Sequence, residues 1–360
     1  MPFTAGEQDW AKSYPLPLPG TLYGAIRSMI LSKRDFHRFV SGDGYDDIGT
    51  PSRKGTLKLK YFTLAKSSDE GNVEFYFPLP ANLSAVEETE QAEEDQQKGS
   101  EGCTKNFRIF ATGLRGLKGT VVKPVSPVHV QSFFYTREDA ESVSGYWINR
   151  DGLMNYLQAK ELQSEDLECV EKFFISESKT GIARDRTTRT SKVGKLYRVD
   201  HHRFQEGISI VALVEGTEES LEGIFTLGGE RRTATVQEIN IDPVEKFDIP
   251  DAEQRFVVYL LTPAIFENTW YPQRICEELE KKGIRVNLVS ANIPGYKVIS
   301  GWDIQKKGPK TLYRAVPEGS VYVFEVTKGS VEDALKEFHC KNISEVNPDE
   351  GYGFALTGKI

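Results

Sequence analysis

The residues with the strongest chemical character lie at 179–203, which read KTGIARDRTTRTSKVGKLYRVDHHR. Eight lysines and arginines stand against two aspartates, a local balance of +6 in a chain whose formal net charge is −8. Cations gathered this closely repel one another unless an anion neutralises them, and a polyphosphate backbone is the commonest such anion. The stretch therefore predicts a nucleic-acid-binding segment, with a solvated basic hairpin as the alternative.

Within this stretch the side chains fall into three chemical roles. Guanidinium and ammonium groups neutralise phosphates, threonine hydroxyls hydrogen-bond phosphate or sugar oxygens, and a tyrosine ring offers a surface for base stacking. The residues that we expect to contact nucleic acid are Arg184, Arg186, Thr187, Arg189, Lys192, Lys195, Tyr197 and Arg198.

A glycine-rich segment, GYGFALTG at residues 351–358, is the second candidate site. Gly351 and Gly353 permit positive φ and a close backbone approach, so amides beside Tyr352 are predicted to form an anion-binding nest that contacts RNA. A tight turn that leads into a strand is the alternative. The spacing does not match the dinucleotide fingerprint GxGxxG, and the segment opens a strand instead of a helix.

Two further segments combine cations with flexible or aromatic residues. LGGERR at 227–232 places Arg231 and Arg232 beside a glycine pair, which predicts either a phosphate-binding turn or an ordinary solvated turn. Residues 294–319 interleave aromatic rings with cations, a composition that suits base stacking and phosphate neutralisation; alternatively, the rings belong to the core. The residues concerned are Tyr296, Trp302, Lys306, Lys307, Lys310, Tyr313 and Arg314.

Histidines are the candidates for catalysis, because general acid–base cleavage of RNA can use an imidazole. His201 and His202 lie in the basic stretch, but adjacent residues of a strand point to opposite faces, so the two cannot act on one phosphate. The motifs HExxH, Walker A and GxSxG are absent from the sequence. We predict a non-catalytic protein without cofactor or metal, and an endoribonuclease that uses His201 or His202 is the alternative.

Composition is that of a globular protein, with 39% hydrophobic and 27% charged residues, and 360 residues suit about two domains. The longest apolar run, FVVYLLTPAIF at 256–266, is about half of the roughly 20 residues that cross a bilayer. The start, MPFTAGEQDW, has no signal-peptide features. The four cysteines lie far apart, which predicts unpaired thiols in a reducing cytoplasm and no zinc site.

Hydrophobic spacing predicts the elements of the first half. A helix begins near Pro19, with Leu22, Ile26, Met29 and Ile30 on one face. Runs at 56–65 and 72–79 predict a hairpin, and a short helix follows at 151–159 with Asp151 as its cap. Strands at 171–177 and 195–204 predict a long hairpin with a polar tip. Residues 84–101 carry seven acidic residues and one lysine, which predicts a disordered or helical acidic insert.

The second half shows a regular alternation of strands and helices. Strands are expected at 255–262, 284–291, 320–327 and 353–360, with helices at 271–283 and 330–339. This β-α-β-β-α-β order is the split ferredoxin-like unit. We expect one helix-covered face and one open face, a platform that RNA-binding domains of this topology use. The whole chain is thus predicted to be α+β, with domains at 1–250 and 251–360.

Taken in order, these segments resemble the family of the third subunit of the Cmr complex, the type III-B CRISPR effector, in the RAMP superfamily. The resemblance runs through nearly the whole chain and is carried by PLPLPGTLYGAIRS, FPLPANL (77–83), TGIARDRTTRTSKVGKLY, LGGERR, SGWDI (300–304), AVPEGSVY (315–322) and GYGFALTG.

The resemblance implies two ferredoxin-like (RRM-like) domains, a protruding β-hairpin thumb at about 175–204 and a C-terminal Gly-rich loop at 351–358. It implies a non-catalytic subunit of prokaryotic antiviral defence, in the cytoplasm and away from membranes. Such a subunit grips the 5′ tag of the guide RNA and bridges the large polymerase-cyclase subunit to the backbone RAMP subunit. A protein-interaction scaffold without RNA contact is a third possibility.

One departure from the family pattern concerns the N-terminus. The family begins with a strand before the segment that here reads PFTAGEQDWAKSYPLPLPG. We therefore expect the first strand of the first ferredoxin-like unit to be missing or replaced by another strand.

Overall fold

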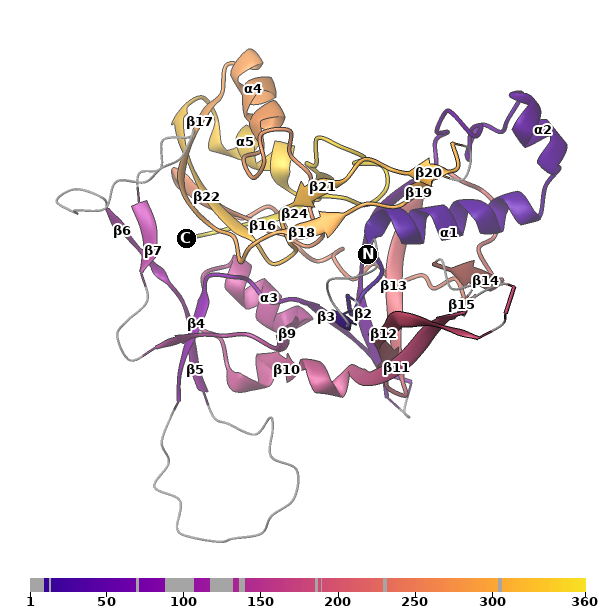
Figure 1. The fold of residues 1–360 in the computed structure, drawn as a ribbon. Helices are drawn as coiled ribbons and strands as arrows, with labels where there is room; N and C mark the ends of the chain where they lie inside the picture. Colours follow the sequence, from indigo (N-terminus) through magenta and orange to yellow (C-terminus); the bar gives the residue numbers. More distant parts are fainter. Residues whose placement is uncertain are drawn as a thin grey trace, which may run out of the picture.

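The protein is described by a computed structural model that covers residues 10–12, 14–68, 71–87, 107–116, 132–135, 140–184, 187–188, 190–228, 232–303 and 306–360. Its elements form a mixed α+β fold with two main antiparallel sheets and smaller ladders (Figure 1). In these ranges no helix combines the length and apolar character of a membrane span.

The main sheet of the first half has the strand order β10-β9-β3-β2-β13, with every neighbouring pair antiparallel. Both outer neighbours of the predicted β2–β3 hairpin, β9 and β13, come from later in the chain. Among the described residues, the N-terminal strand β1 (Trp10–Lys12) belongs to a different sheet. Its strands are β2 (Lys58–Ser67), β3 (Val73–Pro78), β9 (Tyr146–Asn149), β10 (Leu167–Cys169) and β13 (Ile208–Glu215).

Helix α1 (Pro19–Ser32) covers one face of this sheet and confirms the predicted helix. Proline stands at its first turn, where its fixed φ is pre-organised and its missing N–H costs no hydrogen bond. The predicted apolar face is buried, and it packs in one cluster with Leu59 and Phe62 of β2 and with Leu57 just before it. A short helix, α2 (Phe36–Ser41), follows.

The second-half sheet has the order β17-β22-β16-β24-β23, again antiparallel throughout. Helices α4 (Gln273–Lys281) and α5 (Val331–Phe338) connect its strands in the predicted β-α-β-β-α-β order and pack on one face. The strands are β16 (Arg255–Leu260), β17 (Arg285–Asn292), β22 (Val321–Lys328), β23 (Lys341–Asn342) and β24 (Phe354–Gly358).

The expectation of an open face on this sheet is wrong. Phe256, Val258 and Leu260 point toward the helices, whereas Val257, Tyr259 and Leu261 belong to a core shared with the first-half sheet. That shared core also contains helix α3 (Arg150–Leu157). A strand that buries both faces reads as a continuous apolar run, as residues 256–261 do. The surface expected to serve as an RNA platform is therefore filled by the other half.

The remaining described elements are short strands and turns around these sheets. They are β4 (Leu83–Glu87), β5 (Phe107–Ala111), β6 (Gly113–Gly116), β7 (Ser132–Tyr135), β8 (Glu141–Ser142), β14 (Gly223–Leu227), β15 (Arg232–Val236), β18 (Lys297–Ile299), β19 (Trp302–Asp303), β20 (Gly308–Pro309), β21 (Tyr313–Ala315) and the 3₁₀ turns at Ser164–Asp166 and Val170–Lys172.

Three local expectations need correction. Residues 84–87 of the predicted acidic insert belong to strand β4, which pairs with β5; residues 88–101 lie outside the described ranges. Helix α3 is capped by Asn149, whose Oδ1 accepts the N–H of Gly152 at 2.7 Å, and not by Asp151. Cys169 is disulfide-bonded, so it is no unpaired thiol, while Cys276 and Cys340 are free.

Candidate nucleic-acid interface

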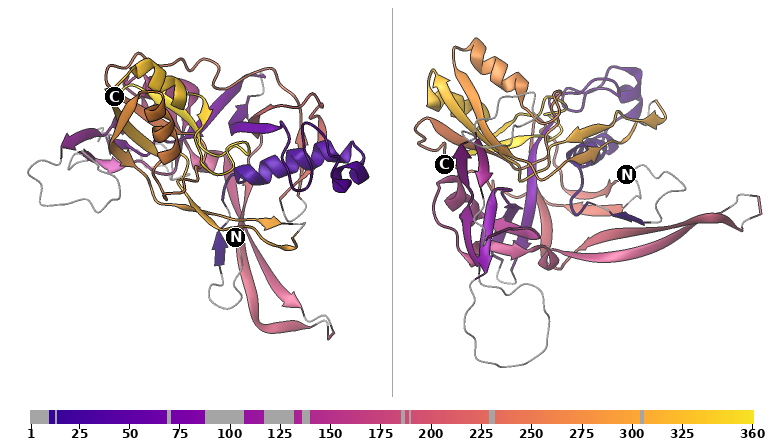
Figure 2. Two further views of the ribbon diagram at one scale, coloured as in Figure 1. Left: turned by 90° about the horizontal axis from the view of Figure 1, so that it is seen from above. Right: turned by 60° about the vertical axis from the view of Figure 1, so that its left-hand side comes forward.

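The basic stretch forms a long antiparallel hairpin of β11 (Phe174–Arg184) and β12 (Ser191–Phe204), here called the basic hairpin. Both strands are longer than predicted, so the turn between them is shorter. In both views of Figure 2 the hairpin, in pink, projects from the body. Its base is anchored by aromatic packing, with the rings of Phe174 and Phe204 5.4 Å apart. Strand β1 (Trp10–Lys12) pairs in parallel with β12.

The pairing register assigns the side chains to two faces, because directly opposed residues share a face and successive residues alternate. Glu177 opposes His201, and Lys179 lies on the same face two residues further along. Ser176 opposes His202 on the other face. The predicted separation of His201 and His202 onto opposite faces is thus confirmed.

Acidic side chains neutralise part of the hairpin's positive charge. Arg203 donates a hydrogen bond from Nε to Glu177 at 2.6 Å. Arg198 donates to Ser178 Oγ at 2.8 Å and lies 3.6 Å from the nearly buried carboxylate of Asp200. Both arginine side chains stay more than half exposed, at 58% and 56%. A guanidinium has five N–H donors, so each retains the capacity to bind a phosphate as well.

A further cation lies close to the base of the basic hairpin. The hydrogen bond from Arg203 holds the pKa of Glu177 below its ordinary value, and the charges of Lys179 and Arg232 act in the same direction. Arg232 is the last residue of the LGGERR segment and the first residue of β15, so a cation of that segment acts on a carboxylate of the basic hairpin. Lys179, Arg203 and Arg232 are all exposed, and the charge of each acts on the Glu177 carboxylate.

Several predicted contact residues fall on parts that the structure does not describe. Arg186, Arg189 and Arg231 lie outside the described residues. Thr187 is exposed in the turn of the hairpin. Four further residues have a described backbone, in β11 or β12, but their side chains are outside the described part: Arg184, Lys192, Lys195 and Tyr197.

The glycine-rich segment is packed instead of exposed. Gly351, Tyr352 and Gly353 are all buried, and Tyr352 is only 3% exposed. The two glycines adopt positive φ (+91° and +73°), and a Cβ on Gly353 would lie 2.5 Å from the backbone nitrogen of Ser344. Burial raises the pKa of Tyr352 to about 12, and its hydroxyl oxygen accepts the N–H of Gly20 at 3.3 Å. These observations favour the packing alternative over the anion nest.

Residues 296–303 and 306–314, here called the arm, have one end packed in the body and the other end at the surface. The two rings differ. Tyr313 packs against a buried cluster that contains Tyr352, as the core alternative predicts, whereas Trp302 is 62% exposed. Lys306, Lys307, Lys310 and Arg314 are all exposed.

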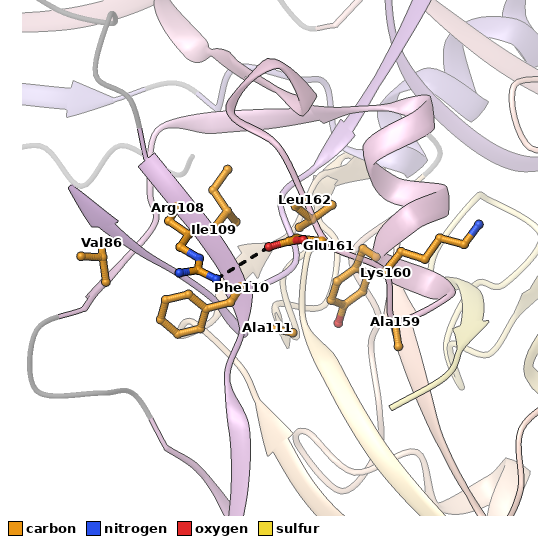
Figure 3. A pocket seen from close by; sticks show the side chains of 10 residues that line it. Val86, Arg108, Ile109, Phe110, Ala111, Ala159, Lys160, Glu161 and Leu162 are labelled. Atoms are coloured by element: carbon orange, nitrogen blue, oxygen red, sulfur yellow. Dashed lines mark ion pairs between the residues drawn. The ribbon is translucent and has the colours of Figure 1, made fainter. Parts of the chain in front are cut away.

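A pocket of about 620 Å³ lies between β5 and the end of α3 (Figure 3). Arg108 and Glu161 face each other across it at 3.9 Å. Tyr156 also lines it, with its hydroxyl donating to Asn82 Oδ1 at 2.7 Å. None of the residues predicted from the sequence lines this pocket, and within the described ranges no group of acidic, histidine or cysteine side chains is arranged to hold a metal ion.

Sequence reasoning missed the acidic partners of the hairpin, Glu177 and Asp200. Asp200 was counted only as a negative charge, and Glu177 lay just outside the basic stretch. Strand alternation was the available signal, since Glu177, Lys179 and the opposed His201 and Arg203 fall on one face once the register is known.

Comparisons with known proteins give one match over the whole chain. A family model described as "CRISPR-associated protein (Cas_Cmr3)" matches residues 1–360. A solved structure, "Cryo-EM structure of the Type III-B Cmr-beta bound to cognate target RNA and AMPPnP, state 1", aligns at 15% identity and a TM-score of 0.43, over 88% of this chain and 81% of that chain. A second, "Cryo-EM structure of the Type III-B Cmr-beta bound to cognate target RNA", aligns at 15% identity and a TM-score of 0.44, over 93% and 83%. No curated protein matches the sequence.

Proposed function

Because the chain belongs to the Cas_Cmr3 family of CRISPR-associated proteins, we propose that it is an RNA-binding subunit of a type III-B CRISPR effector complex. In this proposal the basic hairpin is a thumb that grips the 5′ tag of the guide RNA. The subunit bridges the large polymerase-cyclase subunit to the backbone RAMP subunit in the cytoplasm of a prokaryote. It carries out no catalysis of its own, and its two halves are ferredoxin-like units.

The observation that carries the proposal is the cluster of exposed cations at the base of a projecting hairpin. Arg203 hydrogen-bonds Glu177, Lys179 lies on the same face of the hairpin, and the charge of Arg232 on β15 also acts on that carboxylate. Residues 179–203 carry a local charge balance of +6, and a phosphate backbone can supply the neutralising negative charge. In both views of Figure 2 the hairpin extends away from the body of the molecule, as a finger that grips RNA would.

Topology supports the ferredoxin-like assignment of the second half. The order β17-β22-β16-β24, with α4 and α5 on one face, follows the split β-α-β-β-α-β pattern. Fold alone does not determine function, so the RNA-binding proposal rests on the hairpin and not on the sheet.

Replacing the three clustered cations tests the proposal. We expect the Lys179→Ala/Arg203→Ala/Arg232→Ala variant to bind tagged guide RNA more weakly. Each lost phosphate contact should also reduce the slope of log K against log salt by about 0.7, or about 2 for all three. The matched control is Lys246→Ala/Lys281→Ala/Lys328→Ala, which removes three other exposed lysines and the same charge. The variant Arg184→Ala/Arg186→Ala/Arg189→Ala tests separately whether the turn end of the basic hairpin contacts RNA.

The outcome separates the proposal from its alternatives. If both hairpin variants bind with the affinity and salt slope of the control, the hairpin is not the RNA site. Incubation with repeat RNA in EDTA tests the endoribonuclease alternative, because metal-independent cleavage that is lost in His201→Ala or His202→Ala would make the protein an enzyme.

A further inference from the structure

The arm, residues 296–303 and 306–314, is a second projecting element. It consists of two successive ladders, β18 with β21 and β19 with β20, and it extends away from the second-half sheet (Figure 1). Its base is fixed by burial of Ile299 and Ala315 in a cluster with Tyr352. The base of the arm therefore packs against Tyr352 of the buried glycine-rich segment, and this packing anchors the arm to the body.

The arm begins close to the base of the basic hairpin. The ammonium group of Lys297 lies 5.0 Å from the ring centre of Tyr14. Only two residues before Tyr14, strand β1 ends at Lys12, which pairs with Asp200 of β12. Two residues span about 7 Å at most. The arm and the basic hairpin thus flank the same short N-terminal segment, and the right-hand view of Figure 2 shows both leaving the body on one side.

Aromatic rings and cations gather on the exposed part of the arm. Tyr296 and Trp302 are each 62% exposed, and the guanidinium of Arg314 lies 5.1 Å from the ring centre of Tyr296. The arm carries five basic residues and one acidic residue, in a chain with a net charge of −8. Among the described residues, no carboxylate forms an ion pair with Lys306, Lys307 or Lys310.

We propose that the arm binds an unpaired stretch of RNA, with one base stacked on Trp302 and neighbouring phosphates neutralised by Lys306, Lys307 and Lys310. An exposed ring beside unpaired lysines is the arrangement by which proteins bind single strands without reading their sequence. Lysine is depleted at protein–protein interfaces, so three exposed lysines within eight residues of an exposed tryptophan fit a phosphate backbone better than a protein partner. The choice of RNA over DNA rests on the proposed function, and the contact extends the binding surface beyond the basic hairpin.

Binding of single-stranded oligouridine that carries 5-iodouridine tests the arm in the full-length chain. We expect ultraviolet light to crosslink the probe to the peptide that contains Trp302. Trp302→Ala should weaken binding by about 5- to 150-fold, the usual effect of losing one stacked base. Trp302→Phe keeps a ring and should retain most of the affinity. Lys306→Glu/Lys307→Glu/Lys310→Glu should reduce the salt slope by about 2, whereas Lys246→Glu/Lys281→Glu/Lys328→Glu should leave it unchanged.

The results for the arm and for the basic hairpin are independent. If the hairpin variants lose RNA binding and the arm variants match their control, the proposed function stands and the arm inference is overturned. If the arm variants lose binding and the hairpin variants do not, the arm is the RNA site and the proposed hairpin contact fails. If the arm variants bind RNA normally but no longer assemble with other effector subunits, the arm is a protein contact, which also overturns the inference.

Discussion

Replacement of Gly353 by alanine distinguishes a packed turn from an RNA-binding loop. Gly353 has a φ of +73°, and alanine in this left-handed region costs about 1–2 kcal/mol. The added Cβ would also lie 2.5 Å from the nitrogen and 2.9 Å from the Cβ of Ser344, so backbone must move. Such overpacking costs about 1–3 kcal/mol. Together the two effects predict a loss of about 2–5 kcal/mol in the free energy of unfolding.

Gly283 provides a matched control for the conformational cost alone. It also has a positive φ, of +82°, but a Cβ there would meet nothing within 4 Å. Gly283→Ala should therefore lose only about 1–2 kcal/mol. Urea unfolding of both variants, followed by circular dichroism, measures the difference, which is the steric contribution at Gly353.

RNA binding by the folded Gly353→Ala protein completes the test. Under conditions in which the variant stays folded, we expect wild-type affinity and salt slope, because the turn is buried. The reasoning is refuted if Gly353→Ala is no less stable than Gly283→Ala. It is also refuted if the variant keeps its stability but loses affinity for guide RNA, which would make the segment a binding loop.

Two further predictions concern buried polar groups. Burial lowers the pKa of His339 below its usual value near 6.5, while its Nε2 lies 2.7 Å from the Phe247 carbonyl and its Nδ1 accepts the N–H of Thr357. As the pH falls, His339 therefore takes up a proton in the unfolded chain before it does so in the folded chain, so stability should decrease below about pH 6.5. Urea unfolding midpoints at neutral and mildly acidic pH measure this decrease. If His339→Gln shows the same pH dependence as the wild type, the prediction is wrong. The hydroxyl of Tyr259 donates to the carbonyl of Pro78 across the shared core. Tyr259→Phe removes this hydrogen bond and should cost about 0.5–1.5 kcal/mol in thermal or urea unfolding. A cost near zero would mean that the bond contributes nothing to joining the halves.

The sequence predicted those elements whose pattern is set locally. Leu22, Ile26, Met29 and Ile30 recur at helical spacing, and they form the buried face of α1. Ser330 precedes α5 and caps it, with its hydroxyl accepting the N–H of Asp333 at 3.2 Å. The order of strands and helices after residue 255 was likewise predicted, because each short apolar run is bounded by a turn.

Features that depend on contacts between distant segments were predicted less well. The burial of the second sheet on both faces was encoded in the apolar run at 256–261, but a run alone does not say what covers it. Gly351 and Gly353 were correctly singled out for positive φ, yet the same freedom serves a packed turn as well as an anion nest. Whether Arg198 and Arg203 carry carboxylate partners depends on the strand register, which the sequence leaves open.

The packing of one sheet on the other makes the two halves depend on each other for stability. A cut near residue 250 would expose Val257, Tyr259 and Leu261 on one fragment and Tyr61, Phe75 and Phe77 on the other. Each fragment would expose to water the apolar face that the two halves bury against each other, so each would tend to aggregate when produced alone. Calorimetry of the intact chain should accordingly show both halves melting in a single cooperative transition.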